Sequence, residues 1–209
     1  MITNKNELRF YLMADRMMNR GVFTPSFSMR VKEMLSPDYI MRFLVSMRYK
    51  SYYQHFKRGG VMNVLKYQLW SRRYHRISLK LGFSIGADVF GYGLMIPHWG
   101  TIVVGGSNRV GNYAVLHTST CITDNAKVIG NALYLSSGAK ITSHVILGDN
   151  VSIAANSVVN KDCQGNALLV GAPAVPKRES SPWYIRDGVR FEERVKQIEE
   201  LKKRMNIVS

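Results

Sequence analysis

The sequence predicts a mainly β protein: a parallel β-helix that is preceded by an α-helical domain and followed by a C-terminal helix. Three observations predict this architecture. Within residues 82–175 an aliphatic residue returns about every six positions. The part before this stretch carries helix start and stop signals, and the last thirty residues return to helical spacing. We therefore divide the chain into a helical domain at 1–80, a β-helix domain at 81–177, and a linker with a helix at 178–209.

The N-terminal domain is basic and rich in aromatic residues. It holds 16 Lys and Arg against 4 Asp and Glu, a balance of +12 within a net charge of +15 for the chain, and 13 of the 22 aromatic residues. Ser36-Pro37-Asp38 provides a helix start and Gly59-Gly60 a break. We expect helices at roughly 7–20, 38–57 and 61–80.

The six-residue period of the middle part predicts short strands joined by tight turns, three to a coil, in which neighbouring coils complete one core. A β-sandwich is the alternative, but its strands would alternate with a period of two and turn every 8–12 residues or so. The aliphatic positions are Ile96, Ile102, Val104, Val110, Leu116, Ile122, Ile129, Leu135, Ile141, Leu147, Ile153 and Val159.

The end of the chain has the pattern of an amphipathic helix. After Ser180-Ser181-Pro182, apolar residues fall three, four or six positions apart. Three pairs of opposite charge stand one helical turn apart in the favourable orientation: Glu192/Lys196, Glu199/Lys203 and Glu200/Arg204. We expect the apolar stripe of this helix to pack on the β-helix or on a neighbouring subunit.

Composition sets limits on class and compartment. Two cysteines are too few for a disulfide framework and favour a reducing compartment. No apolar signal segment is found in the first thirty residues, and no apolar run reaches the roughly 18 residues of a membrane span. We expect a cytoplasmic protein. A pI near 10 is compatible with nucleic-acid binding, but no nucleic-acid motif accompanies the charge, and we expect no nucleic-acid partner.

Five stretches carry a resemblance to a known family. Ile129–Ile141 and Leu147–Val159 look like hexapeptide repeats, closed by Val170-Gly171-Ala172-Pro173-Ala174. Two more stretches match one group within that family more closely than the others: Ile96–Val104 (IPHWGTIVV) and Val110–His117 (VGNYAVLH). The chain resembles the hexapeptide-repeat acyltransferases with a left-handed β-helix, and within them serine acetyltransferase and its relatives in polysaccharide gene clusters.

The resemblance implies a left-handed coil, a homotrimer with active sites between subunits, and acetyl-CoA as the acyl donor. By the family pattern, backbone at Ser137 and Ala155 on adjacent coils would face the pantetheine arm. The turn that contains Gly171 and Pro173 would lie near the adenine end. Three cations are candidates for the CoA phosphates or, equally, members of a solvated rim: Lys161, Lys177 and Arg178.

Moving an acetyl group from a thioester to an alcohol needs a base, because an alcohol is a poor nucleophile until its proton is leaving. A histidine with an unperturbed pKa of about 6.5 suits this role near pH 7. His98 matches the histidine that serine acetyltransferases carry near the start of the β-helix, and we assign it as the base. His117 falls on the same face of the next coil, ~4.8 Å along the axis, and is a second base candidate or a group that orients the acceptor. Trp99 is a candidate to stack on the substrate.

The sequence departs from serine acetyltransferases at three places. Pro97 stands where the family usually has Asp, and a second family aspartate falls near Phe83. The loop that brings another histidine to the amino-acid substrate is shortened to Thr123–Val128 and contains none. Relatives that acetylate sugar hydroxyls are similar to this chain in both His98 and His117. The sequence therefore favours a sugar hydroxyl in surface polysaccharide synthesis as the acceptor.

Alternatives to this function stay open. One is a serine O-acetyltransferase of cysteine biosynthesis, and another is a membrane-associated trimeric scaffold without activity. A metal is not expected, because zinc enzymes of similar fold use three interface histidines and His117 lacks a second histidine four or five residues on. The basic helical domain has three possible roles. It is a helical bundle that caps the β-helix, it contacts the anionic inner face of the cell membrane, or it binds an acidic polysaccharide.

Overall fold

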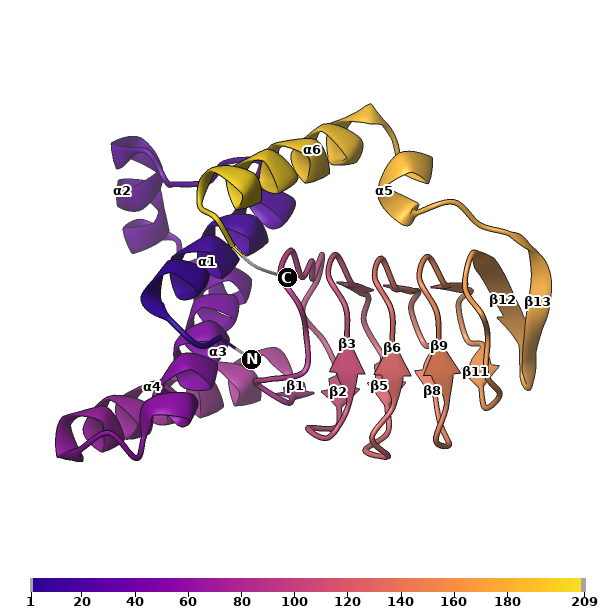
Figure 1. Ribbon diagram of the computed structural model, residues 1–209, viewed down its shortest axis with the longest axis horizontal. Coiled ribbons are helices and arrows are strands. Elements are labelled where there is room, and N and C mark those ends of the chain that lie inside the picture. The colour runs from indigo at the N-terminus through magenta and orange to yellow at the C-terminus, as the bar shows by residue number, and fades with distance from the viewer. Residues whose placement is uncertain (1, 208–209) are drawn as a thin grey trace.

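Four helices precede a parallel β-helix and two follow it within residues 2–207, the part of the chain that the computed structural model describes (Figure 1). The predicted β-helix with helices at both ends is confirmed. Expectation and structure differ at α2, which no sequence pattern predicted, because none of its residues is buried and it shows no apolar stripe facing a core. The helices are α1 (Lys5–Arg20), α2 (Phe27–Leu35), α3 (Tyr39–Phe56), α4 (Val61–Leu81), α5 (Trp183–Arg186) and α6 (Val189–Arg204).

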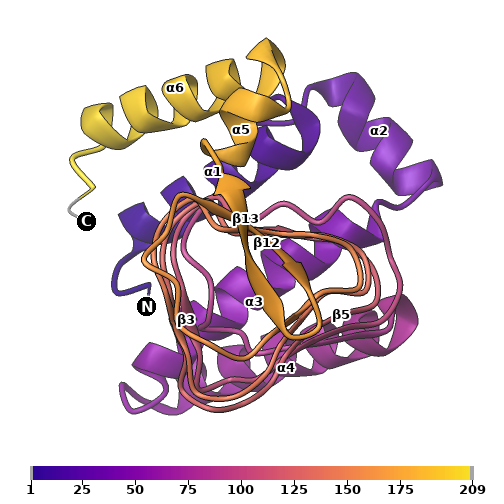
Figure 2. The same ribbon diagram turned by 90° about the vertical axis from the view of Figure 1, so that its right-hand side faces the viewer.

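The strands form three sheets that face one another across a shared interior, and Figure 2 looks along their common axis. The first sheet contains β1 (Phe83–Ile85), β2 (Ile102–Val104), β5 (Thr120–Ile122), β8 (Lys140–Ile141) and β11 (Val158–Val159). The second contains β4 (Val115–Leu116), β7 (Tyr134–Leu135), β10 (Ser152–Ile153), β12 (Ala167–Gly171) and β13 (Ala174–Glu179), with only β12 and β13 antiparallel. The third contains β3 (Arg109–Val110), β6 (Val128–Ile129) and β9 (Ile146–Leu147).

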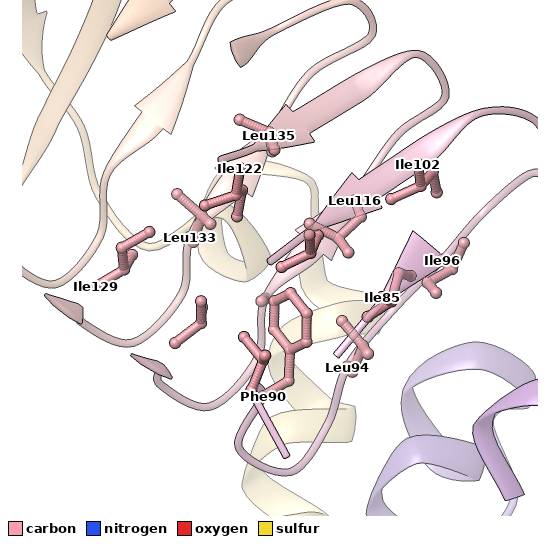
Figure 3. Close-up of a cluster of buried hydrophobic side chains, with 14 of the residues drawn as sticks. Ile85, Phe90, Leu94, Ile96, Ile102, Leu116, Ile122, Ile129, Leu133 and Leu135 are labelled. Atoms are coloured by element: carbon pink, nitrogen blue, oxygen red, sulfur yellow. The ribbon is translucent and has the colours of Figure 1, made fainter. Parts of the chain in front are cut away.

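The interior is a ladder of aliphatic side chains (Figure 3). All twelve aliphatic positions predicted from the repeat are buried, none more than 5% exposed. Strand register stacks them in lines, and one line contains Ile85, Val104, Ile122, Ile141 and Val159. Because full burial of such a side chain stabilises by about 1.5–3 kcal/mol, the ladder is the main source of stability for coils whose strands are two or three residues long.

Side-chain amides and carboxylates hold one set of turns together. The Asn112 side chain accepts a hydrogen bond from the Tyr92 N–H of the preceding coil (3.1 Å), and the Asn131 side chain accepts one from the Asn112 N–H (2.8 Å). Asp149 continues the series by accepting from the Asn131 N–H (2.5 Å). At Gly148, an added Cβ would lie 1.9 Å from the Gln164 carbonyl oxygen, so this turn requires glycine.

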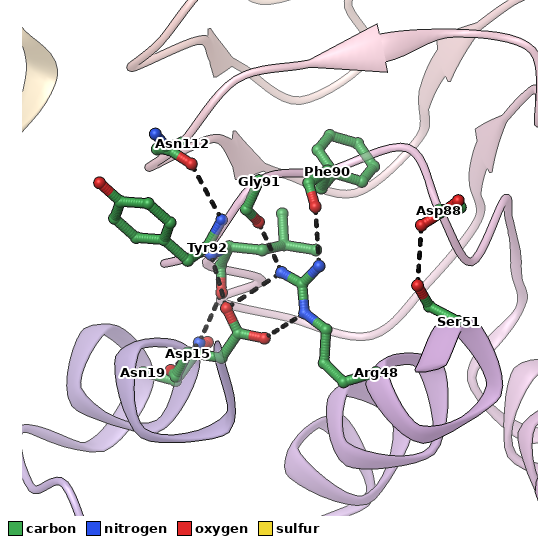
Figure 4. Close-up of polar contacts among 10 residues, drawn as sticks. Asp15, Asn19, Arg48, Ser51, Asp88, Phe90, Gly91, Tyr92 and Asn112 are labelled. Carbon is green, nitrogen blue, oxygen red and sulfur yellow. Dashed lines mark hydrogen bonds and ion pairs between the residues drawn. The ribbon is translucent and has the colours of Figure 1, made fainter. Parts of the chain in front are cut away.

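The helical domain is joined to the first coil by a buried ion pair (Figure 4). Arg48 of α3 donates to the Asp15 carboxylate of α1 (2.8 Å) and to the carbonyl oxygens of Phe90 (2.7 Å) and Gly91 (2.6 Å). The Leu94 N–H donates to the same carboxylate (3.0 Å). Because Arg48 and Asp15 are both 1% exposed, each charge depends on the other and on these backbone groups for its polar partners.

The C-terminal helix α6 packs on the β-helix, which is one of the two predicted positions, and the short helix α5 precedes it. Two of the predicted charge pairs form, Lys196 with Glu192 (2.8 Å) and Arg204 with Glu200 (3.2 Å). Glu199 does not pair with Lys203. It faces the β-helix instead, where its carboxylate accepts hydrogen bonds from the hydroxyls of Tyr92 and Tyr113.

Candidate active site

One edge of the β-helix gathers most of the residues that the sequence singles out. In each coil this edge directly follows the strand of the sheet that contains β4, β7, β10 and β12. Strand register and backbone hydrogen bonds between coils align the edge: the His117 N–H donates to the Leu135 carbonyl (3.0 Å), and the Asn156 N–H to the Ser137 carbonyl (3.0 Å). The structure therefore places four predicted residues in successive coils along this catalytic edge: His98, His117, Ser137 and Ala155.

The two histidines of the catalytic edge have different surroundings. His98 is exposed, whereas His117 is half-buried and its Nε2 lies 2.9 Å from the Tyr134 hydroxyl. Burial lowers the pKa of His117, the nearby His98 lowers it further, and Asp187 opposes the shift. His117 is therefore neutral at pH 7, where its ring can accept a hydrogen bond or a proton.

A cavity of about 770 Å³ borders the segment that carries His98, although His98 itself does not line it. Its walls come from α2, the start of α3, the end of α4 and the two chain neighbours of His98, Pro97 and Trp99. The Trp99 ring is 72% exposed, and it offers an aromatic face to a ligand in this space. Cations and acids both line the cavity, among them Lys32, Lys80 and Asp38.

The residues predicted for the distal part of CoA fall into two groups. Gly171 ends β12 and Pro173 lies in the turn to β13, at the far end of the catalytic edge, and Lys177 and Arg178 are exposed on β13. Lys161 follows β11 and lies on a different edge of the coil. Antiparallel β13 carries Lys177 and Arg178 away from the edge, because Arg178 pairs with Leu168 near the start of β12. The structure thus brings Gly171 and Pro173 to the edge and leaves Lys177, Arg178 and Lys161 apart from it.

Two of the three departures from the serine acetyltransferase pattern, Phe83 and the short loop, have structural counterparts away from the catalytic edge. Phe83 is a buried core residue whose ring packs against Phe43, with centroids 5.0 Å apart. The short loop Thr123–Val128 is held by Lys127, whose Nζ donates to the Thr123 carbonyl (2.6 Å) and hydroxyl (2.8 Å). Neither place offers the catalytic edge a carboxylate or an imidazole.

Sequence reasoning missed three side chains at this edge: Tyr134, Arg186 and Asp187. Tyr134 pairs with Val115 in the parallel sheet, so the repeat register could have placed it one coil beyond His117. Arg186 lies over the Tyr134 ring, with its Cζ 4.6 Å from the ring centroid. Arg186 and Asp187 follow the repeat in sequence, and no periodic signal predicts where they return.

Among the helices of residues 2–207, none combines the length and the apolar composition that a membrane-spanning segment needs. No three His, Cys, Asp or Glu side chains of this region are grouped so that they could hold a metal ion.

Comparisons with known proteins agree on one type of enzyme. No family model matches the chain. Two curated relatives are the serine acetyltransferases of Helicobacter pylori strain J99, 28% identical over 126 residues, and of Synechococcus elongatus, 30% identical over 90 residues. The aligned parts cover 53% of this chain and 74% of the first relative, and 40% of this chain and 37% of the second.

Solved structures match over a larger part of the chain. Serine acetyltransferase from Neisseria gonorrhoeae is 21% identical with a TM-score of 0.60 over 83% of this chain, which spans 66% of that structure. A serine acetyltransferase in complex with CoA is 20% identical with a TM-score of 0.59, over 81% of this chain and 67% of that one. The chain is an acyltransferase of the serine acetyltransferase type. The left-handed β-helix expected for such acyltransferases is therefore the fold of residues 83–171, and the catalytic edge is a feature of that fold.

Proposed function

We propose that this acyltransferase moves the acetyl group of acetyl-CoA to the hydroxyl of L-serine, with His98 as the general base. Curated relatives that are serine acetyltransferases support serine as the acceptor better than the sugar that the sequence motifs favoured. A related structure in complex with CoA supports the donor. The observation that carries the proposal is the single edge that gathers His98, His117 and the backbone at Ser137 and Ala155.

The proposed reaction is a direct transfer. The serine hydroxyl oxygen attacks the thioester carbonyl while the His98 imidazole takes the hydroxyl proton. Backbone N–H groups of the coil turns can stabilise the oxyanion that forms. When the tetrahedral intermediate collapses, the C–S bond breaks and protonated His98 returns the proton to the thiolate, giving O-acetylserine and free CoA. Neutral His117, with its Nε2 beside the Tyr134 hydroxyl, orients the acceptor.

Assembly belongs to the same proposal. His98, Ser137 and Ala155 are all exposed, so a CoA molecule lying along the catalytic edge needs a second wall to exclude water from the thioester. A neighbouring subunit of a homotrimer supplies such a wall. Contact of the basic helical domain with an anionic membrane is a further part of the proposal, supported by its charge balance of +12.

The acceptor is tested by thiol release. We expect saturable release of CoA thiol from acetyl-CoA with L-serine and none above background with N-acetylserine methyl ester used at the same concentration as a hydroxyl control. O-acetylserine identified by mass spectrometry would confirm the product. Thiol release with sugar acceptors but not with L-serine would overturn the serine assignment and leave the acetyl transfer in place.

A sugar hydroxyl is the second candidate acceptor, and one observation favours it. The cavity that borders the segment carrying His98 has a volume of about 770 Å³, far more than serine fills, and the Trp99 ring on its wall is exposed. Aromatic faces of this kind bind the apolar face of a sugar ring. The same thiol-release assay with uronic acids and N-acetylhexosamines decides between the two acceptors.

The donor is tested independently of the acceptor. A ligand that binds only the folded state stabilises it, by about 2.7 kcal/mol at 100 times its Kd. Saturating CoA should therefore raise the melting temperature, and dephospho-CoA should raise it less if cations near β13 hold the phosphate. A melting temperature that no CoA concentration changes would favour the trimeric scaffold without activity.

A further inference from the structure

The chain returns to the catalytic edge after the β-helix has ended. The anchor is Trp183, which is fully buried, with its Nε1 donating to the Tyr113 carbonyl oxygen (2.7 Å). Helix α5 then ends with the Asp187 N–H donating to the Trp183 carbonyl (2.8 Å). The buried indole thereby fixes the position of the two charged residues that close this turn, Arg186 and Asp187.

Arg186 and Asp187 reach His117 through a chain of direct contacts. The Arg186 Nε donates to the Asp187 carboxylate (2.8 Å), and its Nη1 donates to the Ser152 hydroxyl (3.0 Å). Its guanidinium lies over the Tyr134 ring, 4.6 Å from the centroid. The Tyr134 hydroxyl in turn lies 2.9 Å from the His117 Nε2.

Three titratable groups act on His117 directly, His98, Tyr134 and Asp187, and Arg186 reaches it through Tyr134 and Asp187. Asp187 is the acid among them, and it opposes the lowering of the His117 pKa by burial and by His98. The two positions at which the family places aspartates hold Pro97 and the buried Phe83 instead. Asp187 therefore brings to this edge the negative charge that those positions lack.

We propose that Trp183–Asp187 completes the active site, with Arg186 and Asp187 as positioning residues that act through Tyr134 and His117. Arg186 holds the Tyr134 ring where its hydroxyl meets the His117 imidazole, and the Asp187 carboxylate holds the Arg186 guanidinium and stabilises positive charge on the His117 imidazole. The expected effect on catalysis rests on the proposed acetyl transfer, whereas the expected effect of Asp187 on the charge of His117 does not.

The test is the titration of His117 in Asp187→Asn, measured by NMR of the imidazole C–H signals. Loss of the carboxylate removes a group that stabilises imidazolium, so the pKa of His117 should fall. We also expect kcat/KM for thiol release to fall by about tenfold or more, with its acid limb moved to lower pH. Asp187→Glu should recover part of both effects. Glu193→Gln, an equal charge change at an exposed site on α6, is the matched control.

The outcomes separate this inference from the proposed function. A His117 titration that is the same in Asp187→Asn and the parent would overturn the inference, whatever the activity. An unchanged kcat/KM in the same variant would also overturn it. If the parent releases no thiol with any acceptor, the proposed function fails, and the titration still decides whether Asp187 acts on His117.

A second, independent observation concerns helix α4. Its buried residues, Tyr74, Ser78 and Leu81, all lie in its last two turns. The other end of α4 lies away from the β-helix (Figure 1) and exposes four apolar side chains within about 100° of the helix circumference. They are Val61 (77% exposed), Met62 (63%), Leu65 (57%) and Leu69 (63%).

Arginines continue the same side of α4. Arg72, Arg73 and Arg76 join Arg42 and Tyr39 in lining a groove of about 510 Å³, and no acidic residue lines it. None of these arginines forms an ion pair within residues 2–207. An apolar patch that borders a groove of guanidinium groups without carboxylate partners matches the layering of a lipid surface, in which acyl chains lie beneath phosphates.

We propose that the α4 patch and the arginine groove dock the protein on an anionic lipid surface. The positive charge of the helical domain favours a lipid surface over a second copy of the chain as the partner of this patch. A second copy would bring another helical domain with a balance of +12, and like charges would repel across the contact. Anionic lipid supplies the opposite charge, and the patch supplies the apolar area that enters the interface.

The test is co-sedimentation with vesicles of phosphatidylglycerol and phosphatidylcholine against vesicles of phosphatidylcholine alone. The parent protein should bind the anionic vesicles about tenfold more tightly or better, and salt should weaken the binding. Leu65→Glu combined with Leu69→Glu should abolish it, while Val189→Glu, an exposed apolar position on α6, should weaken it far less. Equal binding to both vesicle types, or a change of oligomeric state in place of lost vesicle binding, would overturn the proposal.

Discussion

Replacing His98 with alanine is expected to lower the rate of thiol release by about 10²–10⁴-fold, the usual contribution of a general base. The side chain is exposed, so the replacement removes no core contact and should leave the melting temperature near that of the parent. The measurement is kcat with the acceptor that the parent uses, together with a thermal unfolding curve. A loss of rate without a loss of stability is the signature of a chemical role.

Two comparisons make the His98 result specific. His75→Ala, at an exposed position on α4, removes an imidazole from a remote surface and should keep full activity. His117→Ala should also lower the rate, and the double variant should lose much less than the product of the two losses if both rings serve one step. Turnover of His98→Ala within about threefold of the parent would remove His98 from the mechanism.

The β-helix could be predicted from the sequence because its physics is local and repeated. Each coil must return an aliphatic side chain to the same interior line, so a position such as Ile122 is fixed by its neighbours one coil away on either side, Val104 and Ile141. The same register places His98 and His117 on one edge without any knowledge of distant contacts. For these two residues, the residue type and its position in the repeat were sufficient to predict the location.

Contacts between parts far apart in the sequence could not be predicted in this way. The placement of Arg186 over Tyr134 depends on where the chain turns after β13 and on the burial of Trp183 beneath it. Glu199 likewise satisfied a helical pairing rule with Lys203 but bonds to Tyr92 and Tyr113, because that side of α6 faces the β-helix. The spacing of residues within a helix does not predict which side of that helix packs on the β-helix.

The sequence motifs and the overall similarity to known enzymes point to different acceptors. Pro97 and Phe83 remove the acids that the serine acetyltransferase pattern contains, which favoured a sugar, whereas similarity over the repeat favours serine. That similarity is 28% identity over 53% of this chain for one relative and 30% over 40% for the other. Similarity at this level supports the fold and the acyl chemistry, whereas the choice of acceptor depends on a few side chains.

Breaking the buried pair between Arg48 and Asp15 should have the largest effect on stability. Arg48→Met is expected to lower the free energy of unfolding by about 3–5 kcal/mol, because it leaves the Asp15 carboxylate buried without its counter-charge. Urea denaturation followed by circular dichroism measures this. Arg204→Met is the control, since it removes an exposed pair with Glu200 and should cost less than about 1 kcal/mol.

The double variant distinguishes the cost of an orphaned charge from the value of the pair itself. Arg48→Met combined with Asp15→Leu removes both charges and should recover part of the stability that Arg48→Met alone loses. Recovery should be incomplete, because the carbonyl oxygens of Phe90 and Gly91 and the Leu94 N–H lose their partners in the first coil. A single variant that costs less than about 1 kcal/mol would mean that water replaces the guanidinium at this joint. The helical domain would then be held to the β-helix by apolar packing and by its other hydrogen bonds, such as those from Ser51 to Asp88 (2.7 Å) and from Asn19 to Leu94 (2.8 Å).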